Sequence, residues 1–136
     1  MSSLQFKTPP GAAEKHSDLG HYSQSVDLGN GIVKCSGQGG WHPETGALDA
    51  TDSSKQVALA MENVDIVLKN AGLRGWEDVY LLRSYHCDIT ASWEPTAEAL
   101  RKRIPGHHPI WTAVGVPRLA FPEMLIELEV EAKRQS

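Results

Sequence analysis

WTAVGV at residues 111–116 and LIELEVEA at residues 125–132 are the clearest strand patterns in this 136-residue chain. In the second segment, apolar residues alternate with Glu127, Glu129 and Glu131. Side chains two residues apart lie on the same face of a strand, so one face is apolar and the other acidic. The two segments therefore predict a pair of strands, at 110–116 and 125–132, whose apolar side contributes to a core.

The remaining segments extend this pair into a sheet. Residues 22–27 and 32–36 predict a hairpin, because Gly29-Asn30-Gly31 between them suits a tight turn. Apolar residues recur every three or four positions over 53–71, which predicts a helix that Asp52 or Ser53 caps. A largely apolar strand follows at 79–87, and Pro95 suits the first turn of a second helix that ends near Arg103.

The predicted order is ββαβαββ in a single domain, with residues 1–20 loosely packed at its N-terminus. Two helices on one face of a mixed sheet make an α+β fold. The opposite face is left bare, and we expect it to carry apolar and small residues that a second subunit covers. A homo-oligomer follows from this arrangement.

Composition excludes several classes of protein. The formal net charge is −4 and Lys and Arg are dispersed, so a nucleic-acid partner is not expected. No apolar run reaches the ~20 residues that span a bilayer, and the N-terminal residues lack the apolar core of a signal peptide. We expect a cytoplasmic protein; a mitochondrial one is the lesser alternative, because the arginines of a presequence are also missing. Two cysteines form no disulfide framework, and the spacing of the histidines supports no metal site, so no cofactor is expected.

The candidate site residues lie near strand ends and in loops. Glu127 begins the last strand, where partial burial would raise the pKa of its carboxyl and suit it to proton transfer. Glu129 and Glu131 are interpreted as a solvated face, and Tyr22 as either a half-buried aromatic or a ligand contact. Further candidates for ligand binding are small, polar or aromatic residues: Ser36, Gly37, Gln38, Trp93, Trp111 and Thr112. His86 is interpreted as a buried, hydrogen-bonded histidine.

Several motifs together resemble the RidA/YjgF family. YSQSVDLGNGIVKCSGQ at 22–38 resembles the family's opening hairpin, and PETG at 43–46 the turn that follows it. QVALAMENVDIVLKNAGL at 56–73 resembles its long helix, and SYHCD at 84–88 with WTAVGV is most similar to a YjgH-like branch. The resemblance implies a chorismate-mutase-like fold and a homotrimer with ligand pockets between subunits.

The resemblance also implies a chemistry and a departure from it. Members hydrolyse small enamines and imines; an arginine holds the substrate carboxylate, and a glutamate holds a water. Glu127 matches that glutamate and Tyr22 the pocket aromatic, whereas Trp111 stands where the arginine is expected. Arg83 on the neighbouring strand is an alternative cation.

Two functions therefore stay open: an imine or enamine hydrolase with weak or no 2-aminoacrylate deaminase activity, and a non-catalytic trimeric protein that binds a small molecule. An endoribonuclease or translation inhibitor has less physical support in an acidic chain.

Overall fold

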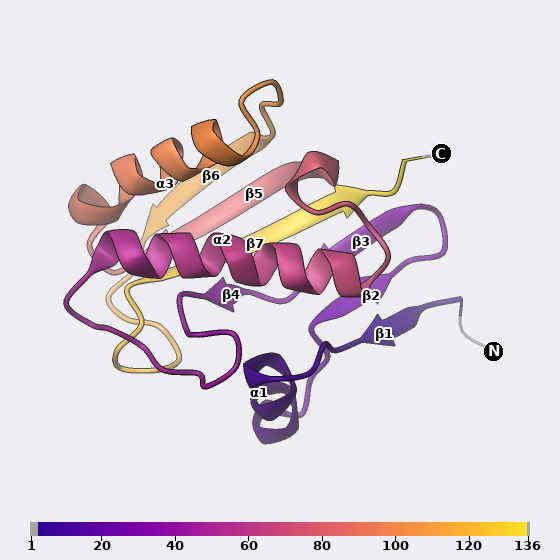
Figure 1. Ribbon diagram of the computed structural model, residues 1–136, viewed down its shortest axis with the longest axis horizontal. Helices are drawn as coiled ribbons and strands as arrows, with labels where there is room; N and C mark the ends of the chain where they lie inside the picture. Colours follow the sequence, from indigo (N-terminus) through magenta and orange to yellow (C-terminus); the bar gives the residue numbers. More distant parts are fainter. Residues whose placement is uncertain (1–2, 136) are drawn as a thin grey trace.

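The computed structural model describes residues 3–135, which form one mixed sheet with three α-helices (Figure 1). In chain order the elements are β1 (Gln5–Lys7), α1 (Ala12–Gly20), β2 (Ser25–Asp27), β3 (Ile32–Cys35), β4 (Gln38–Gly39), α2 (Ser53–Asn70), the 3₁₀ turn η1 (Trp76–Asp78), β5 (Val79–His86), α3 (Ile89–Arg103), β6 (Ile110–Gly115) and β7 (Ile126–Lys133).

The sheet order is β1-β2-β3-β7-β5-β6, and the short β4 also pairs with β7. β5 and β6 run parallel, with α3 as their connection, and the other pairs are antiparallel. β7 lies at the centre of this sheet, bonded to β3, β4 and β5. The α+β class and mixed sheet predicted from the sequence are confirmed.

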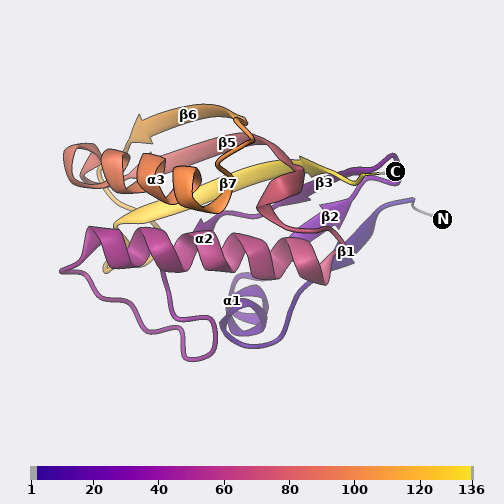
Figure 2. The ribbon, with the colours of Figure 1, turned by 45° about the horizontal axis from the view of Figure 1, so that its top comes forward.

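α2 and α3 cover the same face of the sheet, as the two ribbon views show (Figures 1 and 2). The Asp52 side chain accepts a hydrogen bond from Lys55 N at 3.0 Å and caps α2, as predicted. The buried side of α2 packs on the apolar side of β3, β5 and β7, where the core residues include Val33, Leu82 and Leu128. Burial of these aliphatic side chains at ~25 cal/mol per Å² of apolar surface is the main force that holds the helices on the sheet.

The start predicted for the second helix is wrong. α3 begins at Ile89, six residues before Pro95, and Pro95 lies inside it. The Asp88 side chain accepts a hydrogen bond from Ala91 N and so caps an earlier turn. Thr96 Oγ1 then donates to Ser92 O at 2.8 Å in the turn around the proline. Pro95 has no amide hydrogen to donate to the carbonyl oxygen of Ala91, so α3 lacks one helical hydrogen bond at this point.

Residues 5–20 contain two elements that the sequence pattern did not reveal, β1 and α1 (Figure 1). Ala12, Ala13 and Ser17 of α1 are buried, and Ala12 N donates to Pro43 O at 2.8 Å. β1 pairs with β2, with Phe6 opposite Val26. The loose packing expected for this segment therefore does not describe residues 5–20, while Met1 and Ser2 lie outside the described residues.

The uncovered face of the sheet is more polar than expected. It carries Glu127, Glu129 and Glu131 of β7, next to Arg83 and Tyr85 of β5. Apolar side chains also occur there: Ile110 is 65% exposed and Phe6 61% exposed. The expectation of an apolar, small-residue face is thus correct only toward the sheet edges.

Candidate functional site

Four of the predicted site residues meet in one cavity of about 450 Å³, which we call the Glu127 cavity. It lies where α1, the end of β3, the start of β7 and the loop before β7 come together. Its lining residues are His16, Leu19, Gly20, Tyr22, Ser36, Gly37, Trp41, Ala120, Phe121, Met124 and Glu127. The predicted residues Tyr22, Ser36, Gly37 and Glu127 are all among them.

The Glu127 carboxyl group lies directly over the α-carbon of Gly37. A β-carbon added to Gly37 would lie 2.0 Å from Glu127 Oε1, so any larger residue would displace the carboxyl group. Within residues 3–135, no side chain or amide bonds to that carboxyl group or forms an ion pair with it. Burial raises the pKa of Glu127, and Glu129 raises it further. A carboxyl group with a raised pKa and no protein partner is suited to exchange protons with a ligand or with water.

Ser36 and Tyr22 form the wall beside Glu127. Ser36 Oγ donates to Ser23 O at 2.7 Å, so its hydroxyl is left as an acceptor for a ligand. The Tyr22 side chain is 42% exposed, and its ring lies against Gly20, where an added β-carbon would be 2.7 Å from the ring. The half-exposed ring of Tyr22 therefore lines the cavity, and both interpretations of this residue stay open.

His16 and Phe121 complete the cavity, and the sequence analysis did not identify either. The His16 ring meets Trp41 edge-on at 4.4 Å between centroids and Phe121 at 5.1 Å. Its Nδ1 is buried and has no hydrogen-bond partner among the residues described, and burial lowers the pKa of the imidazole. The buried spacing of Ala12, Ala13, His16 and Ser17 was the available signal, because it places these residues on one side of a helix.

Gln38 and Thr112 lie outside the Glu127 cavity. Gln38 is 1% exposed, and its Nε2 donates to Gln24 Oε1 at 2.7 Å and to Ser36 O at 3.1 Å. Thr112 is exposed on the edge strand β6, opposite Arg83 of β5. Within one chain, neither side chain is positioned to contact a ligand beside Glu127.

Trp93 and Trp111 stack on each other, at 5.0 Å between centroids and 16° between planes. They line a separate hollow of about 340 Å³ between α3 and β6. Trp111 Nε1 donates to Ser84 Oγ at 2.8 Å, on the helix-covered side of the sheet. A single chain therefore does not bring Trp111 and Glu127 into one pocket.

The Trp111 indole is the first member of a buried hydrogen-bond chain. Ser84 Oγ lies 2.7 Å from His86 Nε2, and Ser92 Oγ lies 2.6 Å from His86 Nδ1 and donates to Asp88 O. Because the Ser92 proton is used on Asp88 O, His86 Nδ1 carries a proton and Nε2 accepts from Ser84. Burial lowers the pKa of His86, in agreement with the neutral ring that this series of hydrogen bonds requires. The prediction of a buried, hydrogen-bonded His86 is confirmed.

Glu129 and Glu131, predicted to form a solvated face, are half-buried on the uncovered face and have hydrogen-bond partners there. Tyr85 Oη donates to Glu129 Oε1 at 2.7 Å, and Tyr80 Oη donates to Glu131 Oε1 at 2.7 Å. Arg83 Nη1 lies 3.6 Å from Glu131 Oε2. Arg83 is therefore engaged with Glu131 and does not line the Glu127 cavity.

Two classes of site find no support within residues 3–135. No cluster of three or more His, Cys, Asp or Glu side chains there could hold a metal ion. No helix in the same range has both the length and the apolar character required to cross a membrane.

Comparisons with known proteins show what the chain is similar to. A family model described as endoribonuclease L-PSP matches residues 13–134. The 2-iminobutanoate/2-iminopropanoate deaminase of Salmonella typhimurium is 34% identical over 119 residues, which cover 86% of this chain and 90% of that protein. A RutC family protein of Aquifex aeolicus is 38% identical over 85 residues, and this match spans only 62% of each chain.

Solved structures have the same fold. Protein YJGH is 25% identical with a TM-score of 0.82, and the match covers 98% of both chains. E. coli TdcF, solved with bound serine, is 29% identical with a TM-score of 0.77, covering 97% of this chain and 98% of TdcF.

Proposed function

This chain belongs to the RidA/YjgF family, to which the endoribonuclease L-PSP model corresponds, and from that premise we propose that it hydrolyses a small imine, enamine or related carbonyl compound in the Glu127 cavity. The observation that carries the proposal is the Glu127 carboxyl group, which lies over Gly37 in a cavity of about 450 Å³ with a raised pKa. The relative from Salmonella typhimurium, an imine deaminase by name, supports the same reaction class.

The chemistry follows from one proton-transfer group. Glu127, as carboxylate, takes a proton from a water molecule whose oxygen forms a bond to the imine carbon. Glu127 passes that proton to the imine nitrogen, which gives a carbinolamine. It then takes the proton of the carbinolamine hydroxyl group and passes it to the nitrogen as the C–N bond breaks, so that ammonia and a carbonyl compound are released. The Ser36 hydroxyl oxygen, which is free to accept, can hold the amine or the water during this sequence.

We extend the proposal to a homotrimer with pockets between subunits. Trp111 and Thr112 lie apart from Glu127 within one chain, so a pocket that holds all three requires a second copy. The exposed Ile110 at the edge strand also favours a neighbour there, because it is 65% exposed in the single chain. Sedimentation at micromolar concentration should give three times 14.9 kDa; a monomer would refute this part of the proposal.

Trp111 sets the substrate preference in this proposal. The family's arginine would give a substrate carboxylate two charge-assisted hydrogen bonds, and each hydrogen bond to a charged group contributes roughly 1.5–3 kcal/mol. The Trp111 indole N–H is already used on Ser84 Oγ, so it offers a substrate an apolar surface. We therefore expect an uncharged or bulkier substrate in place of 2-aminoacrylate.

A non-catalytic binding protein is the second candidate. The stacked and hydrogen-bonded Trp111 favours it, because a fixed aromatic surface can bind a ligand without the arginine that the known reaction uses. Two assays separate the candidates. One measures pyruvate release from 2-aminoacrylate, generated in situ by a dehydratase, and the other measures hydrolysis of imines of larger uncharged carbonyl compounds. The hydrolase proposal predicts turnover only with the second group; ligand binding without turnover across both groups supports the binding protein.

A further inference from the structure

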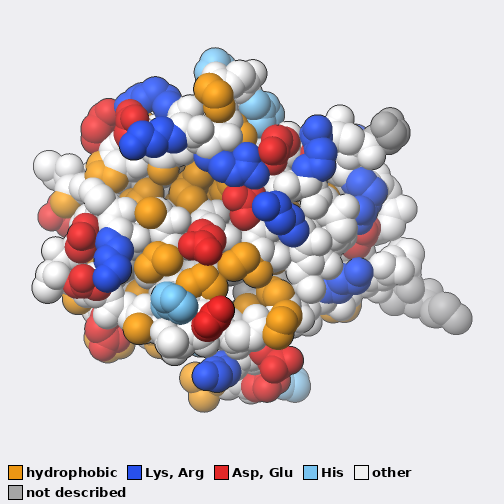
Figure 3. Space-filling model, in the orientation of Figure 1, with side chains coloured by type: hydrophobic (Ala, Val, Ile, Leu, Met, Phe, Trp, Pro, Cys, Tyr) orange, Lys and Arg blue, Asp and Glu red, His pale blue; other side chains and the backbone are white. Residues whose placement is uncertain are grey.

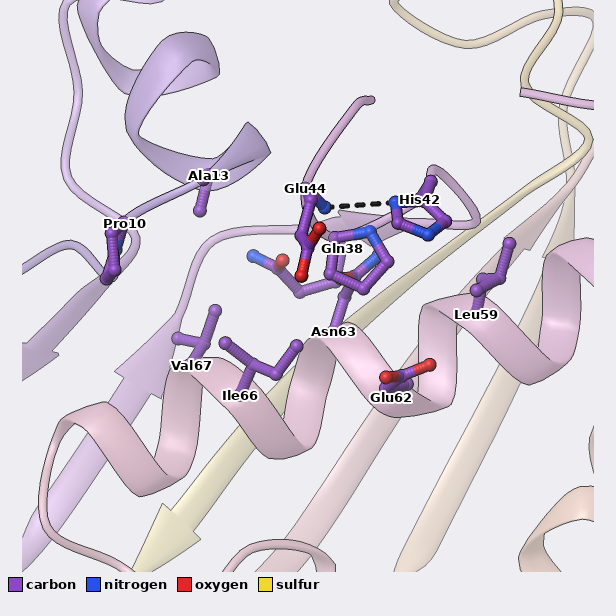
Figure 4. Close-up of a pocket in the computed structure, with 12 residues that line it drawn as sticks. Pro10, Ala13, Gln38, His42, Glu44, Leu59, Glu62, Asn63, Ile66 and Val67 are labelled. Atoms are coloured by element: carbon purple, nitrogen blue, oxygen red, sulfur yellow. Dashed lines mark hydrogen bonds between the residues drawn. The ribbon is translucent and has the colours of Figure 1, made fainter. Parts of the chain in front are cut away.

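A second cavity of about 500 Å³ lies between α2, β4 and the loop at residues 42–44, apart from the Glu127 cavity. Figure 4 shows Leu59 and Ile66 on the side of α2 that faces Glu44 and His42 of that loop, and Glu62 lies between them on the helix. In the space-filling view, acidic and histidine side chains adjoin apolar ones on this helix-bearing face (Figure 3). We call it the α2 cavity; its volume falls in the ~300–1,000 Å³ range of small-molecule sites.

Two buried amide side chains present their oxygens to the α2 cavity. Gln38 is 1% exposed and Asn63 is 4% exposed, and both line the cavity. Gln38 Nε2 donates to Gln24 Oε1 and Ser36 O, and Asn63 Nδ2 donates to two backbone carbonyl oxygens at 2.9 Å each. These contacts fix both amide orientations. Gln38 Oε1 and Asn63 Oδ1 accept no hydrogen bond from residues 3–135, so a ligand is the partner they can take.

The charged groups at the cavity mouth also favour a ligand that donates hydrogen bonds. The carboxylates of Glu44 and Glu62 line it, and neither forms an ion pair with any residue in the described range. His42 Nδ1 accepts from Glu44 N at 3.1 Å and Thr45 N at 3.3 Å, so a neutral His42 keeps its proton on Nε2 (Figure 4). The carbonyl and carboxylate oxygens favour a cation that donates several hydrogen bonds.

We propose that the α2 cavity binds a primary organic ammonium ion, whose N–H groups donate to the Gln38 and Asn63 carbonyl oxygens and to the Glu44 and Glu62 carboxylates. A protonated amine has three donors and one positive charge, which match these acceptors. Leu59 and Ile66 line the same cavity and contact the apolar stem of the ligand. An organic cation is favoured over a metal ion, because no metal-binding cluster occurs in the part of the chain that the structure describes.

Nitrogen-15 NMR titration at pH 7 tests the assignment with three probes of one shape: n-butylammonium, n-butanol and butyrate. We expect butylammonium to shift the side-chain NH₂ signals of Gln38 and Asn63 and to bind at least about tenfold more tightly than butanol. Butyrate should not bind. Equal responses to butylammonium and butanol, or shifts confined to residues of the Glu127 cavity, would overturn the proposal.

The double variant Glu44→Gln/Glu62→Gln should weaken butylammonium binding by about tenfold or more. The matched control is Glu14→Gln/Glu123→Gln, which changes the net charge equally at exposed residues outside the α2 cavity. The control should retain the wild-type affinity. A loss that is the same in both double variants would show that only the overall charge attracts the amine, and the site would then be wrongly assigned.

Discussion

Replacing Ser84 with alanine tests the hydrogen-bond chain that fixes Trp111. Ser84 and His86 are both 0% exposed, and the Ser84 hydroxyl is the acceptor for Trp111 Nε1 and the donor to His86 Nε2. The variant leaves one N–H donor and one nitrogen acceptor unpaired, and each unpaired buried group costs ~1–3 kcal/mol. Trp111 is only half-buried and can recover part of its share from water. We therefore expect Ser84→Ala to lower the free energy of unfolding by about 2–5 kcal/mol.

Urea unfolding followed by tryptophan fluorescence measures this loss at a fixed protein concentration, because subunit association would make the midpoint concentration-dependent. Ser54→Ala is the matched control: Ser54 is exposed on α2, and its hydroxyl forms no hydrogen bond within residues 3–135. The control should change the free energy of unfolding by no more than about 0.5 kcal/mol. If Ser84→Ala lowers the free energy of unfolding as little as Ser54→Ala does, the hydrogen bond to Ser84 does not fix the Trp111 indole.

Four further predictions concern the site and its titrating groups. Glu127→Gln should lower turnover by ~10²–10⁴-fold, and an unchanged rate would refute the role of Glu127. The same variant should raise the free energy of unfolding at pH 7, because a raised pKa means that the ionised carboxylate destabilises the folded state, and Gln has no ionised form. Gly37→Ala should lower turnover while leaving the circular dichroism spectrum unchanged, because the new β-carbon would lie 2.0 Å from Glu127 Oε1; full activity would contradict this contact. Trp111→Arg should increase pyruvate release from 2-aminoacrylate, and no gain would show that the arginine position is not what limits this reaction. Burial lowers the pKa values of His16 and His86, so the unfolded chain takes up protons before the folded one, and the free energy of unfolding should fall below pH ~6.5 by up to about 1.4 kcal/mol per pH unit for each histidine. Urea unfolding of the Glu127→Gln variant, which lacks the opposing contribution of Glu127, measures this fall. A free energy that does not change with pH would contradict the prediction.

The sequence predicted the elements whose stability comes from their own repeated pattern. The helix at 53–71 and the strand at 125–132 were found within one or two residues of α2 and β7, because each has one apolar side along its whole length. α1 was not predicted, because its one-sided spacing extends over only nine residues, Ala12–Gly20, and follows a Pro-Pro-Gly sequence that suggests a loop. Gln24 Nε2 donates to Ala13 O at 3.2 Å and to Ser17 Oγ at 2.9 Å, and such contacts between distant residues leave no periodic signal.

The sequence predicted the part of the candidate site that follows from the alternation of side chains along a strand. Alternation along β7 places three glutamates on one face, and the position of Glu127 at the strand start distinguishes it from the other two, but the sequence does not show which residues surround each carboxyl group. Their neighbours on other strands differ: Tyr85 bonds to Glu129, and Tyr80 and Arg83 engage Glu131. Glu127 has Gly37 beside it, which brings no donor and leaves room for the carboxyl group. A carboxylate beside a residue that supplies space, but no hydrogen-bond donor and no charge, is free to exchange protons with a ligand. For that reason we propose that Glu127 carries the chemistry, whereas Glu129 and Glu131 are held by their neighbours.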